Sequence, residues 1–260
     1  MMTDHAAPVF TGVGVALATL FDDDLAVDYD GTARHARRLV DAGLRAVVVC
    51  GTTGEPETLG DDERLALLDA VLDAVGGGAP VVMGASLPSG LQSAEFAAKA
   101  VERSVAAVLA RSPRGAHDPV GYYRRISEAI DDTPLLGYHF PALAPPGIPL
   151  DALPDLPVRG LKDSSGDPER LLATLDTFPG DLYVGAATLL LMAGELDCTG
   201  AILQLANACP ELCLGAFAGD AKAQRELTAP HLRAKAEFPR GMKSLMHERF
   251  GTSETSRLGA

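Results

Sequence analysis

Short apolar runs alternate along the chain with stretches whose apolar residues recur every three or four positions. The segment 46–50 (AVVVC) is apolar throughout, as in a strand covered on both faces of a parallel sheet. In the segment 29–42, Ala33, Ala36 and Leu39 share one face of a helix. The pattern therefore predicts units in which a buried strand is followed by an amphipathic helix.

The same alternation continues and yields eight candidate strands, most of them followed by a helical pattern. The strands are predicted at 12–20, 46–50, 80–84, 105–109, 134–138, 158–162, 182–184 and 200–205. The helices are predicted at 29–42, 61–75, 92–103 and 120–130, with two more that begin near 168 and 188. Such repeats form an open doubly wound sheet or a closed barrel. Eight units favour the (β/α)8 TIM barrel of the α/β class, whose usual size is ~250 residues.

No linker rich in glycine, serine or proline divides the chain. The glycine triplet at 76–78 and the proline-rich segment 141–157 fall between predicted elements, as loops do. From about Pro210 the pattern is helical to the end. We expect a barrel over residues 1–208 and a short C-terminal helical region over 209–260, packed on the barrel in the same domain.

Composition and charge narrow the classes of partner. The 260 residues include 22 basic and 35 acidic side chains, a net charge of −13, which disfavours nucleic acid and anionic membranes as partners. No apolar stretch approaches the ~18 residues of a membrane span. The N-terminus lacks a charged segment followed by an apolar one, so we expect a cytoplasmic protein without a secretory signal. The four cysteines form no CxxC pair, and we expect no metal site.

In a barrel of this kind, the chemistry lies where strands end. Lys162 ends the apolar run 158–161, and Asp167 with Pro168 has the pattern of a helix N-cap and first turn. A lysine in the barrel mouth loses hydration, which lowers the pKa of its amine, and a neutral amine can form a Schiff base with a carbonyl. Alternatively, Asp163 or another carboxylate at the rim neutralises this lysine.

Two further strand ends carry candidate chemistry. In the segment 51–55 (GTTGE), the glycines around Thr52 and Thr53 let backbone amides converge on an anion, while the hydroxyls add donors. The same segment also suits a plain turn from strand to helix. Tyr138 ends another strand, where its phenol could transfer protons beside a Schiff-base lysine or cap a loop carbonyl. For His139 we expect a structural role.

The order GTTGE, YHFPAL and GLKDSSGD resembles the dihydrodipicolinate synthase and N-acetylneuraminate lyase family of pyruvate-dependent class I aldolases. The resemblance extends from about Val9 through Leu212. It implies a (β/α)8 barrel with a C-terminal helical region, assembled as a homo-oligomer, usually a dimer of dimers. It also implies that no cofactor is needed, because the substrate is activated by a covalent imine with a lysine of the chain.

The resemblance also implies roles for individual residues. Lys162 would form the Schiff base with pyruvate or another 2-oxo acid, Tyr138 would relay protons, and Thr52 would be its hydroxyl partner. The substrate-binding positions would be Gly51, Thr53, Gly185 and Ile202, with Thr53 and the neighbouring amides on the carboxylate and Ile202 acting through its main chain.

Three departures from the family pattern concern the second substrate and the assembly. Synthase members carry an arginine after the tyrosine for a carboxylate, whereas residues 142–144 (ALA) offer no cation. The polar residues with which lyase members bind a polyol are replaced at 185–188 (GAAT) and by Leu203. Buried hydroxyls without partners cost ~1–3 kcal/mol each, so we expect a small or apolar aldehyde. The segment 111–115 (RSPRG) lacks the aromatic pair with which synthases contribute a tyrosine to the neighbouring subunit.

The leading hypothesis is thus a Schiff-base lyase or aldolase that joins or cleaves a 2-oxo acid and an aldehyde. Two alternatives stay open. One is a non-catalytic relative that binds a 2-oxo acid, and the other is a sugar-acid dehydratase that uses the same lysine.

Overall fold

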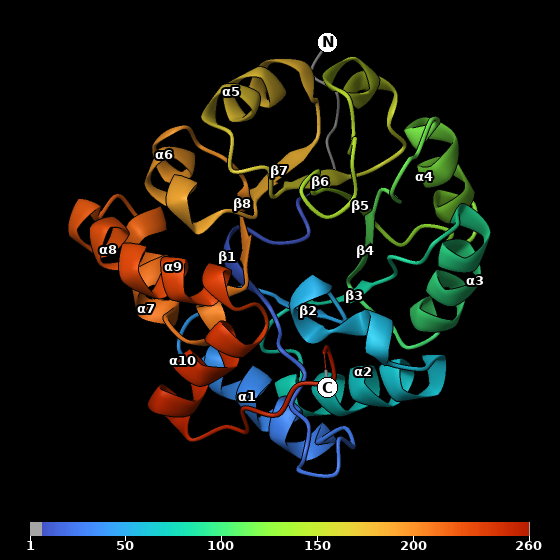
Figure 1. Cartoon of the computed structure of the whole chain (residues 1–260). Helices are drawn as coiled ribbons and strands as arrows, with labels where there is room; N and C mark the ends of the chain where they lie inside the picture. The colour runs from blue at the N-terminus through green and yellow to red at the C-terminus, as the bar shows by residue number, and fades with distance from the viewer. Residues whose placement is uncertain (1–6, 260) are drawn as a thin grey trace.

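A computed structural model describes residues 7–259 and shows eight parallel strands that close into a barrel (Figure 1). Each strand pairs with the next in the sequence, and β8 pairs with β1. The strands are β1 (Gly12–Ala16), β2 (Val47–Val49), β3 (Val81–Gly84), β4 (Ala107–Arg111), β5 (Leu135–His139), β6 (Gly160–Asp163), β7 (Asp181–Val184) and β8 (Gly200–Leu203). The predicted fold class is confirmed.

The expectation of no secretory signal rests partly on residues 1–6, which lie outside the described residues.

Helices surround the barrel and follow the strands. The ring contains α1 (Tyr29–Asp41), α2 (Asp61–Val75), α3 (Gly90–Val101), α4 (Pro119–Ser127), α5 (Pro168–Thr177) and α6 (Leu190–Glu195). The connections hold the short 3-10 helices η1 (Thr52–Gly54), η2 (Pro56–Thr58), η3 (Leu150–Asp155), η4 (Ala187–Leu189) and η5 (Leu205–Asn207). The C-terminal region consists of α7 (Pro210–Phe217), α8 (Ala221–Glu226), α9 (Thr228–Ala236) and α10 (Arg240–Phe250). In Figure 1 these four helices lie against one side of the ring, next to α6 and α1.

Local capping explains where several helices begin. Asp167 accepts the backbone amide of Glu169 at 2.9 Å and starts α5 at the predicted position. The third helix starts at Gly90, two residues before the predicted boundary, because the Ser89 side chain caps it. The predicted helix near 188 divides into the 3-10 turn η4 and α6.

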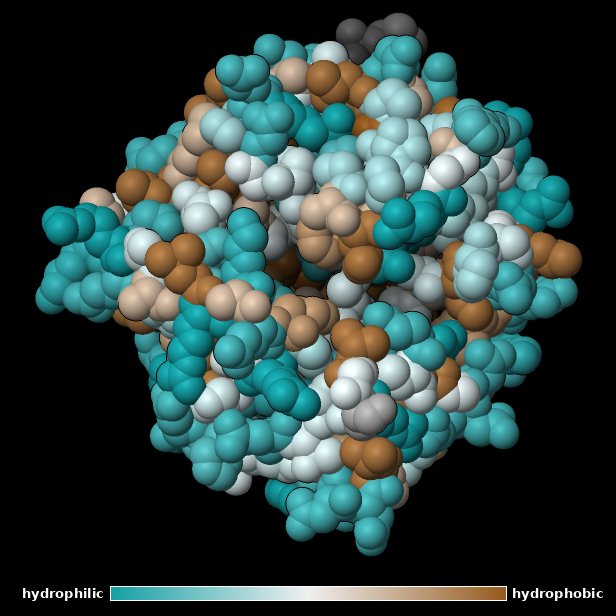
Figure 2. Space-filling model, viewed as in Figure 1, coloured by the Kyte–Doolittle hydropathy of each residue, from teal (hydrophilic) through white to brown (hydrophobic). Residues whose placement is uncertain are grey.

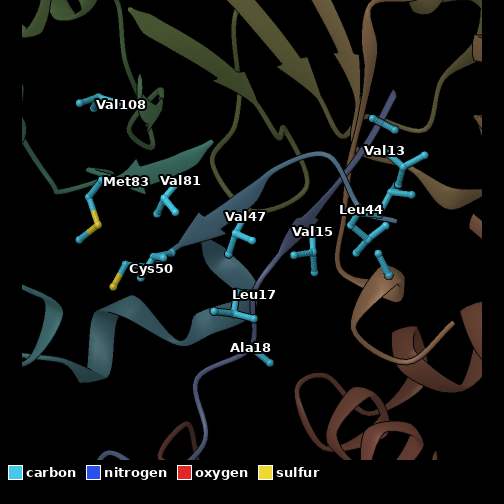
Figure 3. Packing of buried hydrophobic residues seen from close by; sticks show 14 of the residues in the cluster. Val13, Val15, Leu17, Ala18, Leu44, Val47, Cys50, Val81, Met83 and Val108 are labelled. Carbon is cyan, nitrogen blue, oxygen red and sulfur yellow. The ribbon is translucent and has the colours of Figure 1, made fainter. Parts of the chain in front are cut away.

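Buried side chains form two layers. The outer layer fills the space between the strands and the helices, and Figure 3 shows Val15, Val47 and Leu44 within it. The inner layer fills the barrel with alternate residues of the strands. At its floor, the ring of Phe10 stacks on Tyr183 with 4.6 Å between centroids, and the Tyr183 hydroxyl donates to the Phe10 carbonyl at 2.9 Å. This buried stack fills the barrel near its amino end, whereas the chemistry of such barrels lies at the carboxyl end.

Figures 1 and 2 view the carboxyl ends of the strands, and Figure 2 shows a hollow near the middle of this face. The C-terminal segment crosses the same face close to β2 and η1 (Figure 1). Among residues 7–259, no helix has both the length and the apolar composition needed to cross a bilayer.

One strand boundary differs from the prediction in a way that affects the site. The fourth strand was predicted at 105–109 but runs from Ala107 to Arg111. Ala107 and Leu109 point into the barrel, so alternation directs Arg111 inward as well. A residue that the sequence placed in a loop therefore ends a strand at the barrel mouth.

Candidate active site

Three chemically active side chains are paired in register on three adjoining strands. Arg111 of β4 pairs in register with Tyr138 of β5, which in turn pairs with Lys162 of β6. Residues two positions earlier, such as Leu109 and Leu136, belong to the inner layer of the barrel. Because side chains alternate along a strand, all three groups point into the barrel, and Tyr138 is itself part of the inner layer.

Lys162 is enclosed in the mouth. The residue is only 4 % exposed, and its Nζ is 4.3 Å from the centroid of the Tyr138 ring. Burial lowers the pKa of this lysine; the contact with Tyr138 opposes that shift, and the positive charge of Arg111 adds to it. The net pKa lies below the ordinary lysine value.

The alternative partner for Lys162 is engaged elsewhere. The Asp163 carboxylate forms an ion pair with Arg170 at 2.8 Å and accepts the Ser165 amide at 2.7 Å. Within residues 7–259, no carboxylate forms an ion pair with Lys162. The amine is therefore buried without a counter-charge, which favours its neutral and nucleophilic form.

The lowered pKa of Lys162 leads to a measurable prediction. Competitive acylation followed by peptide mass analysis should show Lys162 reaching half-maximal reactivity at a lower pH in the folded protein than in the urea-unfolded chain. The sign follows because burial disfavours the protonated amine only in the folded state. Arg111→Met should raise this midpoint, since it removes a nearby positive charge. Equal midpoints in folded and unfolded protein would contradict the assignment.

The turn after β2 contributes a hydroxyl to the same mouth. The Thr52 Oγ1 accepts a hydrogen bond of 3.0 Å from Arg111 Nη1, which crosses from β4. The turn is held by the Gly54 amide, which donates to the Gly51 carbonyl at 2.8 Å, and by Thr19 Oγ1, which donates to the Gly54 carbonyl at 2.7 Å. Among the described hydrogen bonds, Thr52 is thus joined to Arg111 and not to Tyr138.

The remaining substrate-binding candidates occupy different depths. Thr53 is buried within η1, directly after Thr52. The side chain of Ile202 packs in the inner layer of the barrel, and its backbone pairs in register with Gly14 of β1. Gly185 lies beside the lysine, because a Cβ added there would be 3.1 Å from Lys162 Cε.

Gly185 provides a steric test of the site. A Cβ at this position would also overlap with Ser164 Oγ, so Ser164 or Lys162 must move. We expect Gly185→Ala to slow imine formation with pyruvate by at least about tenfold, since small displacements of reacting groups are costly. The matched control is Gly60→Ala, where an added Cβ meets no atom within 4 Å. Trapping rates by mass spectrometry test this, and equal rates for both variants would contradict the placement.

His139 lies next to this centre but has a structural contact. Its Nδ1 accepts the Ile148 amide at 2.9 Å, and burial lowers the pKa of the imidazole to about 4. The Arg170 Nη2 donates to the Ile148 carbonyl at 2.8 Å. These bonds hold the loop that follows β5 to the end of β5 and to α5.

Two features of the candidate site were missed by reasoning from the sequence. Arg111 was assigned to a loop, although the inward alternation of Ala107 and Leu109 extends to it. Tyr123 of α4 donates to the Ala110 carbonyl at 3.0 Å and accepts the Tyr138 amide at 3.2 Å, so it fixes the ends of β4 and β5 from outside the barrel. No spacing signal in the sequence marks that contact.

Across residues 7–259, no group of three or more His, Cys, Asp or Glu side chains is arranged to hold a metal ion. The chemistry available at the mouth is that of an amine, a phenol, a hydroxyl and a guanidinium.

Comparisons with known proteins agree on one family. Residues 9–249 match the model of the dihydrodipicolinate synthetase family. An uncharacterized DapA-like lyase of Halobacterium salinarum is 33 % identical over 243 residues, which cover 88 % of this chain and 80 % of that protein. A 4-hydroxy-tetrahydrodipicolinate synthase of Methanopyrus kandleri is 31 % identical over 232 residues, with 83 % and 77 % coverage.

Solved structures show the same fold. The protein YagE of Escherichia coli K12, determined in complex with pyruvate, superposes with a TM-score of 0.89 at 21 % identity and covers 97 % of this chain and 93 % of its own. A monomeric dihydrodipicolinate synthase variant superposes with a TM-score of 0.87 at 23 % identity, with coverage of 97 % and 91 %.

Proposed function

Because the chain belongs to the dihydrodipicolinate synthetase family, we propose that it is a Schiff-base lyase or aldolase acting on pyruvate or another 2-oxo acid together with an aldehyde. The observation that carries the proposal is the buried Lys162, whose amine has no carboxylate partner among the described residues and contacts the ring of Tyr138. Members of this family are lyases, so the reaction class agrees with the relatives.

The proposed reaction begins at the Lys162 amine. Its lone pair attacks the keto carbon of the 2-oxo acid, water leaves, and a protonated imine forms. Loss of a proton from C3 gives the enamine, whose C3 attacks the aldehyde carbon while the aldehyde oxygen takes up a proton. Water then adds to the imine, releases the product and regenerates the amine. Cleavage follows the same steps in reverse.

The neighbouring side chains have proposed roles in proton transfer and binding. The Tyr138 phenol, which contacts Lys162, would carry protons to and from the oxygen lost as water. Thr52 would be its hydroxyl partner once the substrate is bound, and Thr53 with the amides of the Gly51 turn would hold the 2-oxo acid carboxylate. Gly185 would leave room for the imine, and Ile202 would line the site with its main chain.

The proposal also covers the location, assembly and cofactor requirement of the enzyme. It describes a cytoplasmic homo-oligomer without a metal or other cofactor, with residues 1–208 and 209–260 in a single domain. The net charge of −13 supports the absence of nucleic-acid and membrane partners. A monomeric synthase variant among the similar structures shows that this fold also exists without partners.

Borohydride trapping tests the proposed function. Reduction in the presence of pyruvate should add the reduced pyruvyl mass to the peptide that contains Lys162, and not to the peptide of Lys222, whose side chain is 84 % exposed. An unmodified Lys162, with a known class I aldolase trapped in parallel, would overturn the mechanism.

The two alternatives give different outcomes in the same preparation. A non-catalytic relative would be stabilised by pyruvate against heat without turning over any aldehyde in a panel. A sugar-acid dehydratase would be trapped at Lys162 but would release a product lighter by one water, without carbon–carbon cleavage.

A further inference from the structure

Arg111 carries a positive charge in the mouth that no described residue compensates. Within residues 7–259 its guanidinium forms no ion pair, and its single side-chain hydrogen bond goes to Thr52 Oγ1 at 3.0 Å. A guanidinium has five N–H donors in a planar fork that matches a carboxylate. Most of these donors are therefore available to a ligand.

The hydrogen bond to Thr52 has a fixed direction. A guanidinium only donates, so the Thr52 oxygen accepts and its own proton points elsewhere. Arg111 and Thr52 can then present N–H and O–H donors side by side. Donors of both kinds in one place suit an anion with two oxygens.

A charge count through the proposed reaction shows which substrate supplies that anion. When Lys162 forms the imine, its positive charge is balanced by the carboxylate of the same 2-oxo acid. Arg111 carries a further positive charge on β4, two strands away from Lys162 of β6, and it pairs in register with Tyr138 of β5. A second negative charge is needed to balance it, and the only other reactant is the aldehyde.

We propose that Arg111 is the specificity-determining residue of this site and binds a carboxylate carried by the aldehyde. This inference rests on the proposed function and deepens it, because both reactants would then be anionic carbonyl compounds. It replaces the small or apolar aldehyde expected from the sequence. That expectation was based on residues 142–144, where no cation is present. It did not consider Arg111, which lies at the end of β4 in the same barrel mouth.

The test compares acids with their neutral amides. The ligands are glyoxylate, 4-oxobutanoate and the neutral amide of each acid. Each ligand is titrated calorimetrically into two preparations of the protein. One has been trapped with pyruvate and borohydride, and the other is untreated. The wild type should bind one of the acids at least tenfold more tightly than its amide. Arg111→Met should reduce this preference below threefold, and Arg111→Lys should keep part of it.

The matched control is Arg124→Met, an exposed arginine on α4, which should retain the full preference for the acid. In the wild type, kcat/KM for condensation with pyruvate should likewise be at least tenfold higher for the preferred acid than for its amide. An acid preference that survives in Arg111→Met, or a wild type without any acid preference, would refute the inference.

Two further outcomes separate this inference from others. If Arg111→Met weakens pyruvate trapping tenfold and leaves the acid preference intact, the guanidinium acts on the 2-oxo acid or on the Lys162 amine, and the inference is wrong. If wild-type Lys162 is never trapped, but the acid preference of the untreated protein disappears in Arg111→Met, the proposed function fails and the anion site stands.

Discussion

Lys162→Met is expected to remove pyruvate trapping and to lower the turnover of any 2-oxo acid and aldehyde pair by at least about 10³-fold, because the proposed nucleophile is lost. The substitution keeps the volume of a straight apolar chain, so the barrel interior stays filled. Steady-state kinetics with mass-spectrometric detection of product measure the effect. The control is Lys222→Met, at a side chain that is 84 % exposed and far from this chemistry.

A stability measurement distinguishes a catalytic lysine from a structural one. Lys162 is buried without a carboxylate partner among the described residues, so its amine costs desolvation energy that a thioether does not. Lys162→Met should therefore melt at the same temperature as the wild type or higher, while activity disappears. A variant that loses both activity and several degrees of melting temperature would point to a structural role.

The barrel could be predicted because its strands are buried on both faces. A run such as 46–50 is apolar at every position, and this pattern depends on the local sequence alone. The end of β4 could not be placed in the same way. Arg111 is charged and precedes a turn with proline and glycine, so local propensity favours a loop, whereas pairing with Tyr138 of β5 extends the strand.

The catalytic candidates were predictable for a different reason. Lys162 and Tyr138 lie at the ends of recognisable strands and Thr52 follows one, and the family resemblance orders them around one mouth. What the sequence could not supply is the contact between Arg111 and Thr52, since the two residues are 59 positions apart and meet only when the barrel closes. The partners of Glu55, the last residue of the GTTGE turn, are likewise distant in the sequence and could not be predicted from it.

Glu55 is part of a buried ion pair that links the turn after β2 to the C-terminal region. Its Oε1 lies 2.7 Å from Lys243 Nζ of α10, and the two side chains are 0 % and 1 % exposed. Its Oε2 accepts the Ser256 hydroxyl and the Leu258 amide, each at 2.8 Å. Lys243 Nζ also lies 4.4 Å from the centroid of the Phe21 ring.

Lys243→Met should destabilise the protein by about 3–5 kcal/mol, because it leaves the Glu55 carboxylate buried without its cation. At about 2–4 °C per kcal/mol for a chain of this size, the melting temperature should fall by roughly 6–20 °C. The exposed pair between Lys222 and Glu226, 3.8 Å apart, is the control, and Lys222→Met should cost less than about 1 kcal/mol.

The double variant Glu55→Gln/Lys243→Met isolates the contribution of the charges. Removing both charges should recover most of the lost stability, since the cost of the single change is an uncompensated ion and not a missing contact. The amide oxygen introduced by Glu55→Gln can still accept from the Leu258 amide, so the C-terminal segment stays attached in the double variant. In Lys243→Met alone, hydrogen exchange at Leu258 should accelerate, because the Glu55 side chain that accepts its amide is left uncompensated. Additive losses in the double variant would show instead that Glu55 and Lys243 act separately, and that the turn carrying Thr52 is fixed without the C-terminal region.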